Sequence, residues 1–432
     1  MCTRIEEVPS SIGSLTNLRE LDLMGTAIEE VPSSIGSLTK LTILYLGGTA
    51  IKEVPSSIGS LMNLRELDLG QTAIEEVPSS IGSLTNLKEL DLSWTAIEEI
   101  PSSIGSLTNL RELDLSWTAI EEVPSPFQHL HNLRHLSLHH CDKFRSFPEI
   151  AENIETLKLE WTATKEVPLS IGSLTKLTEL YLYKTAIKEI PSSIGSLTNL
   201  RVLDFERSAI EEVLSSIGSL PNLTFLKKIY CKRLKHVSPN ICKLKSLPRL
   251  SFEGCFNLGT FPEISEIMER LVELSLSRTA IKDLPLSIEN LTGLLTLELY
   301  SCKNLERLLS SICNLRFLRD LDVSFCLKLD KLPRNFGNLK SLEHLKAART
   351  AIDQLQSSFT SLKKLEELDC CGCRGLTWPP MLGLSRSLRE LFLGYCNLTE
   401  IPEDICRLSS LEELHVKMIL KVYPKASSNF LI

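Results

Sequence analysis

The chain has 432 residues, with 47 basic and 54 acidic side chains and a net charge of −7. This balance argues against nucleic-acid binding, because that function needs a clustered basic face. No stretch approaches the ~20 consecutive apolar residues that span a membrane. The opening residues, MCTRIEEVPSSIG, also lack the charged and apolar segments of a secretion signal. We therefore expect no nucleic-acid partner and no membrane span.

One segment of about 23 residues recurs along the whole chain. LRELDLMGTAIEEVPSSIGSLT begins at Leu18, and near copies begin at Leu64 and Leu110. The first residue of the segment recurs at Leu18, Leu41, Leu64, Leu87, Leu110, Leu133, Ile154, Leu177, Leu200, Leu223, Leu247, Leu271, Leu294, Leu318, Leu342, Leu365, Leu388 and Leu411. This period with the spacing L-x-x-L-x-L-x-x-N/C is the signature of leucine-rich repeats.

The repeats define the predicted domain organisation. We expect a partial N-terminal repeat over 1–17, one leucine-rich repeat domain of about 18 repeats over 18–416, and an irregular C-terminal tail over 417–432. Both ends stop without the polar cap that a stack of repeats needs to cover its core. This favours a piece of a longer protein.

The first half of a repeat predicts a short strand. Leu21 and Leu23 alternate with Glu20 and Asp22, a period of two that gives a strand one buried face. Equivalent strands of successive repeats would pair in parallel, ~4.8 Å apart. Lys228 occupies a buried position in this pattern, so we expect the strand near it to slip, bulge or open, because burying an ammonium group is costly.

The second half predicts a return path and a short helical turn. Pro32 ends any extended segment, and SSIGSL then contributes Ile35 and Leu38 to the core, with serines available to cap a single helical or 3₁₀ turn. The predicted fold is an α/β solenoid. It is a leucine-rich repeat horseshoe with the parallel β-sheet on the concave face and turns or short helical segments on the convex face.

The cysteines follow the repeat rather than a disulfide or zinc pattern. Seven of the 13 lie eight residues after a strand start, where other repeats have threonine or serine: Cys141, Cys231, Cys255, Cys302, Cys326, Cys373 and Cys396. Cys242, Cys313 and Cys406 take the glycine position of SSIGSL. We expect a ladder of small polar side chains that bonds loop backbone. Free buried thiols suit a reducing compartment.

The repeat resembles a specific family. The consensus L-x-x-L-x-L-x-x-T/C-A-I-E-E-V-P-S-S-I-G-S-L-T-N is similar to the leucine-rich repeats of plant intracellular immune receptors of the TIR-NBS-LRR disease-resistance class. The segments SFPEIAENIETLKLEWTATKEVPLSIGSL, from Ser146, and TFPEISEIMERLVELSLSRTAIKDLPLSIENL, from Thr260, resemble the variant repeat of that class.

The resemblance implies a cytoplasmic protein that functions in plant innate immunity and signal transduction. This region would be the sensor or autoinhibitory arm, which binds a pathogen effector or a host target protein. In a longer receptor it would also contact the nucleotide-binding domain. The phosphate-binding sequence G-x-x-x-x-G-K-[ST] is absent, so we expect no nucleotide cofactor in this chain.

Aromatic side chains that recur in phase predict the binding surface. Trp94, Trp117, His140 and Trp161 hold the same position in four successive repeats, directly before the ladder residue. With neighbouring outward residues they form the predicted partner-binding patch: Trp94, Trp117, His135, His139, His140, Trp161, Tyr181 and Tyr183. A row of exposed aromatics is typical of a binding hot spot. The alternative is that the rings only stack on one another and shield the ladder.

Neither a metal site nor a catalytic site is predicted. His135 and His139 would lie ~13 Å apart on a strand, too far to share one zinc ion. The repeated glutamate pairs, such as Glu29 and Glu30, lie on an open rim with no pocket to shift their pKa values. Basic and acidic residues side by side on the strands, such as Arg65 and Glu66, would neutralise each other. We expect a protein that is not an enzyme.

Three other functions remain open. Asn222, Asn290 and Asn397 begin glycosylation sequons, which would suit an extracellular receptor ectodomain. A Ras-pathway-type scaffold also uses L-P-x-x-I repeats, but places asparagine where this chain has threonine or cysteine. The ragged ends are also consistent with a receptor fragment that has no present function.

Overall fold

The computed structural model describes residues 5–377, 387–396, 398 and 400–416. The chain divides into two compact units, Met1–Arg249 and Leu250–Ile432. The predicted partial first repeat contains a 3₁₀ helix, η1 (Ser10–Ser14). The predicted tail, 417–432, lies outside the described residues, and the single domain over 18–416 stays a prediction.

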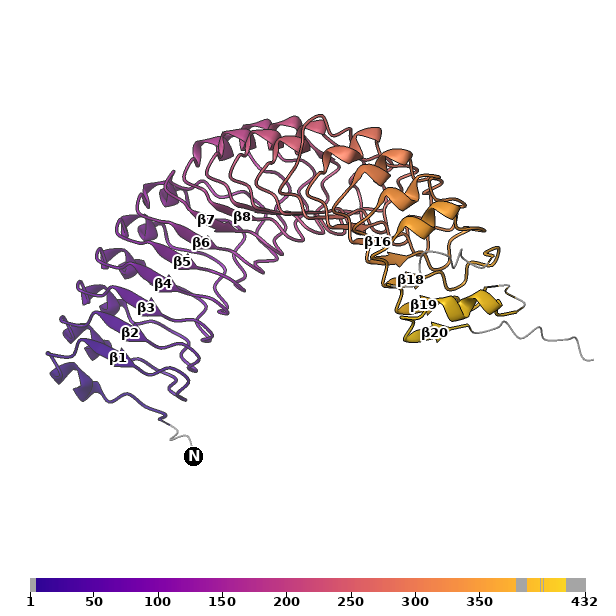
Figure 1. Ribbon diagram of the computed structural model, residues 1–432. Helices are drawn as coiled ribbons and strands as arrows, with labels where there is room; N and C mark the ends of the chain where they lie inside the picture. The colour runs from indigo at the N-terminus through magenta and orange to yellow at the C-terminus, as the bar shows by residue number, and fades with distance from the viewer. Residues whose placement is uncertain (1–4, 378–386, 397, 399, 417–432) are drawn as a thin grey trace, which may run out of the picture. The chain divides into compact units, whose positions relative to one another are not determined.

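The first unit combines strands of two or three residues with 3₁₀ helices (Figure 1). Its strands are β1 (Glu20–Asp22), β2 (Ile43–Tyr45), β3 (Glu66–Asp68), β4 (Glu89–Asp91), β5 (Glu112–Asp114), β6 (His135–Ser137), β7 (Thr156–Lys158), β8 (Glu179–Tyr181), β9 (Val202–Asp204), β10 (Glu212–Val213), β11 (Phe225–Lys227) and β12 (His236–Val237). Its other helices are η2 (Ser33–Ser37), η3 (Ser56–Ser60), η4 (Ser79–Ser83), η5 (Ser102–Ser106), η6 (Ser125–His129), η7 (Leu169–Ser173), η8 (Ser192–Ser196), η9 (Ser215–Ser219) and η10 (Pro239–Lys243).

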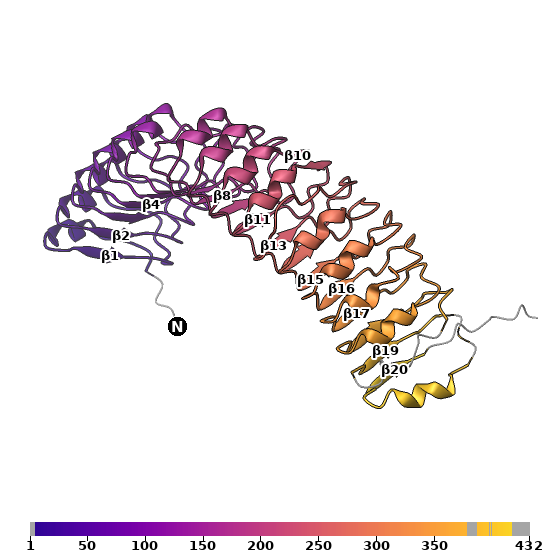
Figure 2. The same ribbon diagram turned by 45° about the horizontal axis from the view of Figure 1, so that its top comes forward.

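The second unit repeats the pattern, and Figure 2 shows its 3₁₀ helices stacked in a row. After β13 (Arg249–Ser251), its strands are β14 (Glu273–Ser275), β15 (Thr296–Glu298), β16 (Asp320–Asp322), β17 (His344–Lys346), β18 (Glu367–Asp369), β19 (Glu390–Phe392) and β20 (Glu413–His415). Its helices are η11 (Leu286–Asn290), η12 (Ser310–Asn314), η13 (Phe336–Asn338), η14 (Ser357–Ser361) and η15 (Glu403–Arg407).

Each unit is a ladder of parallel strands in constant register. In the first unit Leu44 pairs with Leu67, and Leu67 with Leu90, so the central residues of the strands align. The second unit keeps the same alignment from β14 to β20. These central leucines are buried, and together with the helix residues Ile35 and Ile58 they form the core. The predicted α/β solenoid of leucine-rich repeats is confirmed.

The strand before Lys228 does not slip or open, so that expectation is wrong. The strand β11 keeps full register with β9, with Leu226 opposite Leu203. Lys228 directly follows β11, and its side chain is 0% exposed. The backbone ladder and the buried Leu226 hold the strand in place despite the lysine.

The serines of SSIGSL do not cap their helices as expected. The N-cap residue of η2 is Pro32, with φ −66° and ψ 145°, and no side chain caps the helix. Proline presets the extended entry to the helix, and the serines lie inside it. A serine that does cap a helix is Ser238, whose hydroxyl accepts a hydrogen bond from the Asn240 N–H.

The ladder of small polar side chains is confirmed. The Thr95 hydroxyl donates to the Leu92 carbonyl of its own repeat at 2.8 Å. The Cys141 thiol instead donates to the Leu115 carbonyl of the preceding repeat at 3.0 Å. No disulfide joins the twelve described cysteines, and most of them are buried, but Cys406 is exposed, contrary to expectation.

A second ladder was not predicted. The Asn86 side-chain amide donates to the Met62 carbonyl of the previous repeat at 2.8 Å, and Asn109 to Thr85 in the same way. The sequon residue Asn222 makes the equivalent bond to the Thr198 carbonyl, whereas Asn290, at the end of η11, donates to the Ile264 carbonyl, and Asn397 lies outside the described residues. In the part of the chain that the structure describes, no helix has the length and hydropathy needed to cross a bilayer.

Candidate binding surface

One backbone position sets the geometry of the predicted patch. Seven residues after each strand start, in every repeat where that residue is described, φ is positive. It is 56° at Trp94, 60° at Trp117 and 58° at both His140 and Trp161. Such a conformation costs about 1–2 kcal/mol for a residue with a side chain. The N–H of each residue donates to a carbonyl of the next repeat, from Trp94 to Ser116 at 2.8 Å for example, which offsets this cost.

The four predicted residues stack into one continuous aromatic column (Trp94, Trp117, His140 and Trp161). The ring centroids of Trp94 and Trp117 are 4.1 Å apart, at an interplanar angle of 15°. Trp117 lies 3.6 Å from His140, and His140 lies 4.4 Å from Trp161, again nearly parallel. One repeat therefore advances the column by one ring thickness.

The rings of the column stack on one another and are still exposed to solvent. Trp94 is 52% exposed and Trp117 is 38% exposed, although each ring packs face to face with a neighbour. The ring faces are occupied, so the edges remain available to solvent and to a partner. Each stacked pair contributes about 0.5–1.5 kcal/mol beyond simple burial, so the column is preorganised.

Cationic side chains continue the column beyond Trp161. The Lys184 ammonium lies 3.2 Å from the centroid of the Trp161 ring, and the Arg207 guanidinium lies over Tyr183 at 5.9 Å. Tyr183, a predicted residue, meets Trp161 edge-on at 5.8 Å. The sequence analysis did not identify Lys184 and Arg207. They occupy the same position of the repeat as the column residues, and this position was the signal that could have identified them.

His139 joins the column from the side and couples it to a buried carboxyl. Its ring meets Trp117 and His140 edge-on, and its Nδ1 lies 3.5 Å from Oε2 of Glu160. Burial raises the pKa of Glu160 to about 7, although the positive charge of Lys158 lowers it in part. Burial also lowers the pKa values of His139 and His140, and Lys184 lowers that of His140 further.

Two predicted residues lie apart from the column. His135 is exposed on β6, where it pairs in register with Glu112 and Thr156. Tyr181 lies on β8, and its hydroxyl donates to the Glu179 carboxylate at 3.1 Å. No ring contact joins either residue to the aromatic column within the described ranges.

The acidic row on the neighbouring strands is partly structural. The Asp91 carboxylate accepts the N–H of Ser93 at 2.7 Å, and Asp114 accepts that of Ser116 at 2.8 Å. These bonds fix the turn that leads into the column. No ion pair within 4 Å is formed by Arg65, Lys88 or Arg111 among the described residues. Burial and the neighbouring Glu66 and Glu112 raise the pKa of Glu89, but the positive charges of Lys88 and Arg111 lower it in part.

Comparisons with known proteins agree with this architecture. A family model described as a leucine-rich repeat region matches residues 81–166, 169–275 and 250–374, and a leucine-rich repeat model matches 387–408. The structure of the Leptospira interrogans LRR protein LIC12759 superposes with a TM-score of 0.65 at 27% identity, covering 86% of this chain and 88% of that one.

Curated relatives are plant disease-resistance proteins, which confirms the resemblance seen in the repeats. TMV resistance protein N of Nicotiana glutinosa is 33% identical over 190 residues, covering 43% of this chain and 16% of that protein. The disease resistance-like protein DSC1 of Arabidopsis thaliana is 29% identical over 184 residues, covering 43% of this chain and 10% of that protein. The chain thus spans less than a fifth of the length of these relatives.

Proposed function

Because the chain belongs to the leucine-rich repeat family, whose repeats are protein-interaction modules, we propose that it is a non-catalytic recognition module of plant immunity. It acts as the sensor or autoinhibitory arm of an intracellular receptor. Its partner is a pathogen effector or a host target protein, and in a longer receptor also the nucleotide-binding domain. The similarity to plant resistance proteins supports this proposal.

The exposed aromatic column is the observation that carries the proposal. Stacking immobilises Trp94, Trp117 and Trp161 before any partner arrives, so binding loses little side-chain entropy there. Rigid aromatic side chains in a row are typical of interface hot spots. The cation of Lys184 at one end adds a charged contact beside the rings.

Free thiols support a cytoplasmic location. Cys141, Cys231 and Cys302 are buried, and each donates to a backbone carbonyl, so the ladder requires them in the reduced form. A reducing compartment keeps cysteines in that state.

Partner capture by column variants tests the proposal. Tagged protein is expressed in leaf tissue with and without pathogen challenge, and captured proteins are quantified by mass spectrometry. We expect Trp94→Ala and Trp117→Ala to lower the recovery of a specific partner about tenfold or more, because hot-spot truncations cost at least 2 kcal/mol. The partner is then purified, and its dissociation constant is measured for each variant.

The matched control is Leu169→Ala. Leu169 is also a large exposed apolar residue of the first unit, but it lies on η7 and outside the column. The proposal fails if every protein captured by the native chain is captured equally by both tryptophan variants. It also fails if Leu169→Ala lowers capture as strongly.

A further inference from the structure

The aromatic column ends on a cation, Lys184. This residue holds the same position of the repeat as the ring residues, with φ 54°, and its N–H donates to the Glu206 carbonyl of the next repeat at 2.9 Å. The Trp161 ring lies between His140, at 4.4 Å between ring centroids, and the Lys184 ammonium, at 3.2 Å from the Trp161 centroid. The ammonium thus takes the place of the next ring, and the column and this charge form one surface.

The Lys184 ammonium is held in place but is not neutralised. Among the residues that the structure describes, its side chain forms no hydrogen bond and no ion pair. The carboxyl groups at the preceding position of the two adjacent repeats are engaged elsewhere. Glu206 pairs with Lys227 at 2.6 Å, and Glu160 lies 3.5 Å from His139. A positive charge therefore remains at this end of the column.

Such an ammonium group favours an anionic partner. It carries three N–H donors, and the Trp161 ring takes up only one side of it. A freely moving lysine loses side-chain entropy when it forms an ion pair, whereas Lys184 is half-buried and already ordered on the ring. A hydrogen bond between two charged groups is also stronger than one between neutral groups. A carboxylate supplied by a partner would therefore meet a preorganised cation.

The column also sets the spacing of the groups that a partner must present. Trp117 lies three repeats before Lys184, so at ~4.8 Å per repeat the two positions are about 14 Å apart. An extended segment rises about 3.3 Å per residue, so roughly four residues span this distance. Side chains four residues apart on an extended segment lie on the same face. One face of such a segment can thus contact both the rings and the cation.

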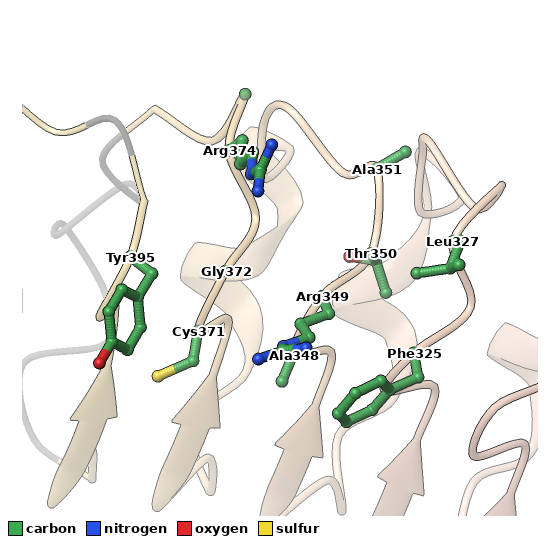
Figure 3. A pocket seen from close by; sticks show the side chains of 11 residues that line it. Phe325, Leu327, Ala348, Arg349, Thr350, Ala351, Cys371, Gly372, Arg374 and Tyr395 are labelled. Carbon is green, nitrogen blue, oxygen red and sulfur yellow. The ribbon is translucent and has the colours of Figure 1, made fainter. Parts of the chain in front are cut away.

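The second unit does not repeat this combination. Figure 3 shows Phe325 and Arg349, which hold the position in consecutive repeats, and the guanidinium carbon lies 5.3 Å from the ring centroid. However, Ser301 precedes Phe325 at this position, and Gly372 follows Arg349. Because neither residue has a ring, no stack extends in either direction. We therefore place the site in the first unit.

We propose that the aromatic column binds an extended segment of a partner protein in which an aspartate or glutamate pairs with Lys184. An apolar side chain about four residues away packs on the exposed ring edges of Trp94 and Trp117. Gln71, which precedes Trp94 at this position, is uncharged, so the acidic residue also determines which way the segment lies. This inference rests on the proposed function, because it uses the same column and adds the chemistry of the partner.

Selection from a library of random dodecapeptides displayed on phage tests the pairing with the purified full chain. Selected peptides are synthesised, and their dissociation constants are measured for the native chain and for variants. Lys184→Met removes the charge and keeps an unbranched side chain that can cover Trp161. We expect peptides that require Trp117 to contain aspartate or glutamate, and Lys184→Met to weaken their binding about tenfold, as for the loss of a charge-assisted pair.

Two protein variants and one peptide change control this experiment. Lys184→Arg should retain binding, because arginine keeps the charge and Arg207 holds the same position in the next repeat. Lys188→Met should also bind normally, because Lys188 is an exposed lysine of the same repeat outside the column. Replacing the acidic residue of the peptide by its amide should weaken binding to the native chain about tenfold and leave binding to Lys184→Met unchanged. This last comparison needs no further protein variant to fold.

The outcomes separate this inference from the proposed function. The inference is overturned if the selection yields no peptide that requires both Trp117 and Lys184, or if Lys188→Met weakens binding as much as Lys184→Met. Peptides that require Trp117 but bind Lys184→Met equally well would overturn the inference and leave the proposed function intact. If Trp94→Ala and Trp117→Ala both leave binding unchanged, the proposed function fails together with the inference.

Discussion

At the scale of single residues, the position with positive φ in each repeat keeps one backbone conformation while its side chain varies. The same φ is found at glycine, tryptophan, histidine, lysine and arginine, because backbone hydrogen bonds to the next repeat hold it. The side chain at this position is therefore free to change without altering the turn. The aromatic column arises from this one position.

Glu160 gives the first prediction, a pH-dependent loss of stability. Its pKa of about 7 in the folded chain lies above the ordinary glutamate value of 4.5, so between these pH values the folded chain holds a proton that the unfolded chain releases. The contribution of Glu160 to stability is therefore greatest below pH 4.5 and decreases as the pH rises to 7. We expect Glu160→Gln to exceed the native protein in stability by about 1–3 kcal/mol at pH 8 and to match it near pH 4.5.

Urea unfolding midpoints at pH 4.5 and pH 8 measure this difference. The lowered pKa of His140 acts in the opposite direction but is common to both proteins, whereas His139 lies 3.5 Å from Glu160 and also loses that neighbouring carboxyl in the variant. A Glu160→Gln variant whose advantage is the same at both pH values would contradict the prediction.

At the scale of elements, the 3₁₀ helices stack through glycine. A Cβ atom placed on Gly82 would lie 2.6 Å from the Ser103 carbonyl oxygen and 2.8 Å from its Cβ. Gly36 and Gly59 approach Ser57 and Ser80 in the same way. Glycine thus permits the close approach of adjacent helices in these repeats, whereas Glu289 and Cys313 hold the same position in η11 and η12.

Gly82→Ala tests this close approach. Although alanine favours helices, we expect this variant to lose about 1–3 kcal/mol, because the neighbouring backbone must move to admit the methyl group. Ser79→Ala, at an exposed position of the same helix, should change stability by less than about 0.5 kcal/mol. Equal unfolding midpoints for the two variants would show that the helices can separate without cost.

The element scale also shows what the sequence could predict. Strand positions, buried leucines and the threonine–cysteine ladder follow from local spacing, because each repeat packs against copies of itself. The positive φ did not follow, although glycine at Gly25 and Gly48 was a signal for it. The contact between Lys184 and Trp161 was also not predicted, because it depends on the orientation of the side chains, which the repeat period does not determine. For the same reason Lys228 was wrongly expected to disturb its strand.

At the scale of the whole molecule, each strand depends only on its immediate neighbours. The strand β5, for example, pairs with β4 and β6, which belong to the repeats directly before and after it. In such a chain, stability is approximately a sum of terms for single repeats and their interfaces. A defect should therefore remain local.

Hydrogen exchange measured by mass spectrometry checks this locality. Leu113 is buried at the centre of β5, and Leu113→Ala should cost about 2–5 kcal/mol. We expect faster exchange in residues 89–137 and unchanged exchange in the second unit. Glu112→Ala, on the exposed side of the same strand, is the control. Uniformly faster exchange across both units would mean that the chain unfolds as one cooperative block.

The near-identity of the copies at Leu64 and Leu110 has a genetic consequence. Each copy offers the same faces to the repeat before it and the repeat after it, so a duplicated or deleted copy would find compatible neighbours at once. Unequal recombination between such copies would add or remove whole repeats. Side chains that were separated along the surface would then become neighbours. New combinations of exposed side chains would thus arise in a single recombination event, while the buried core residues stay the same.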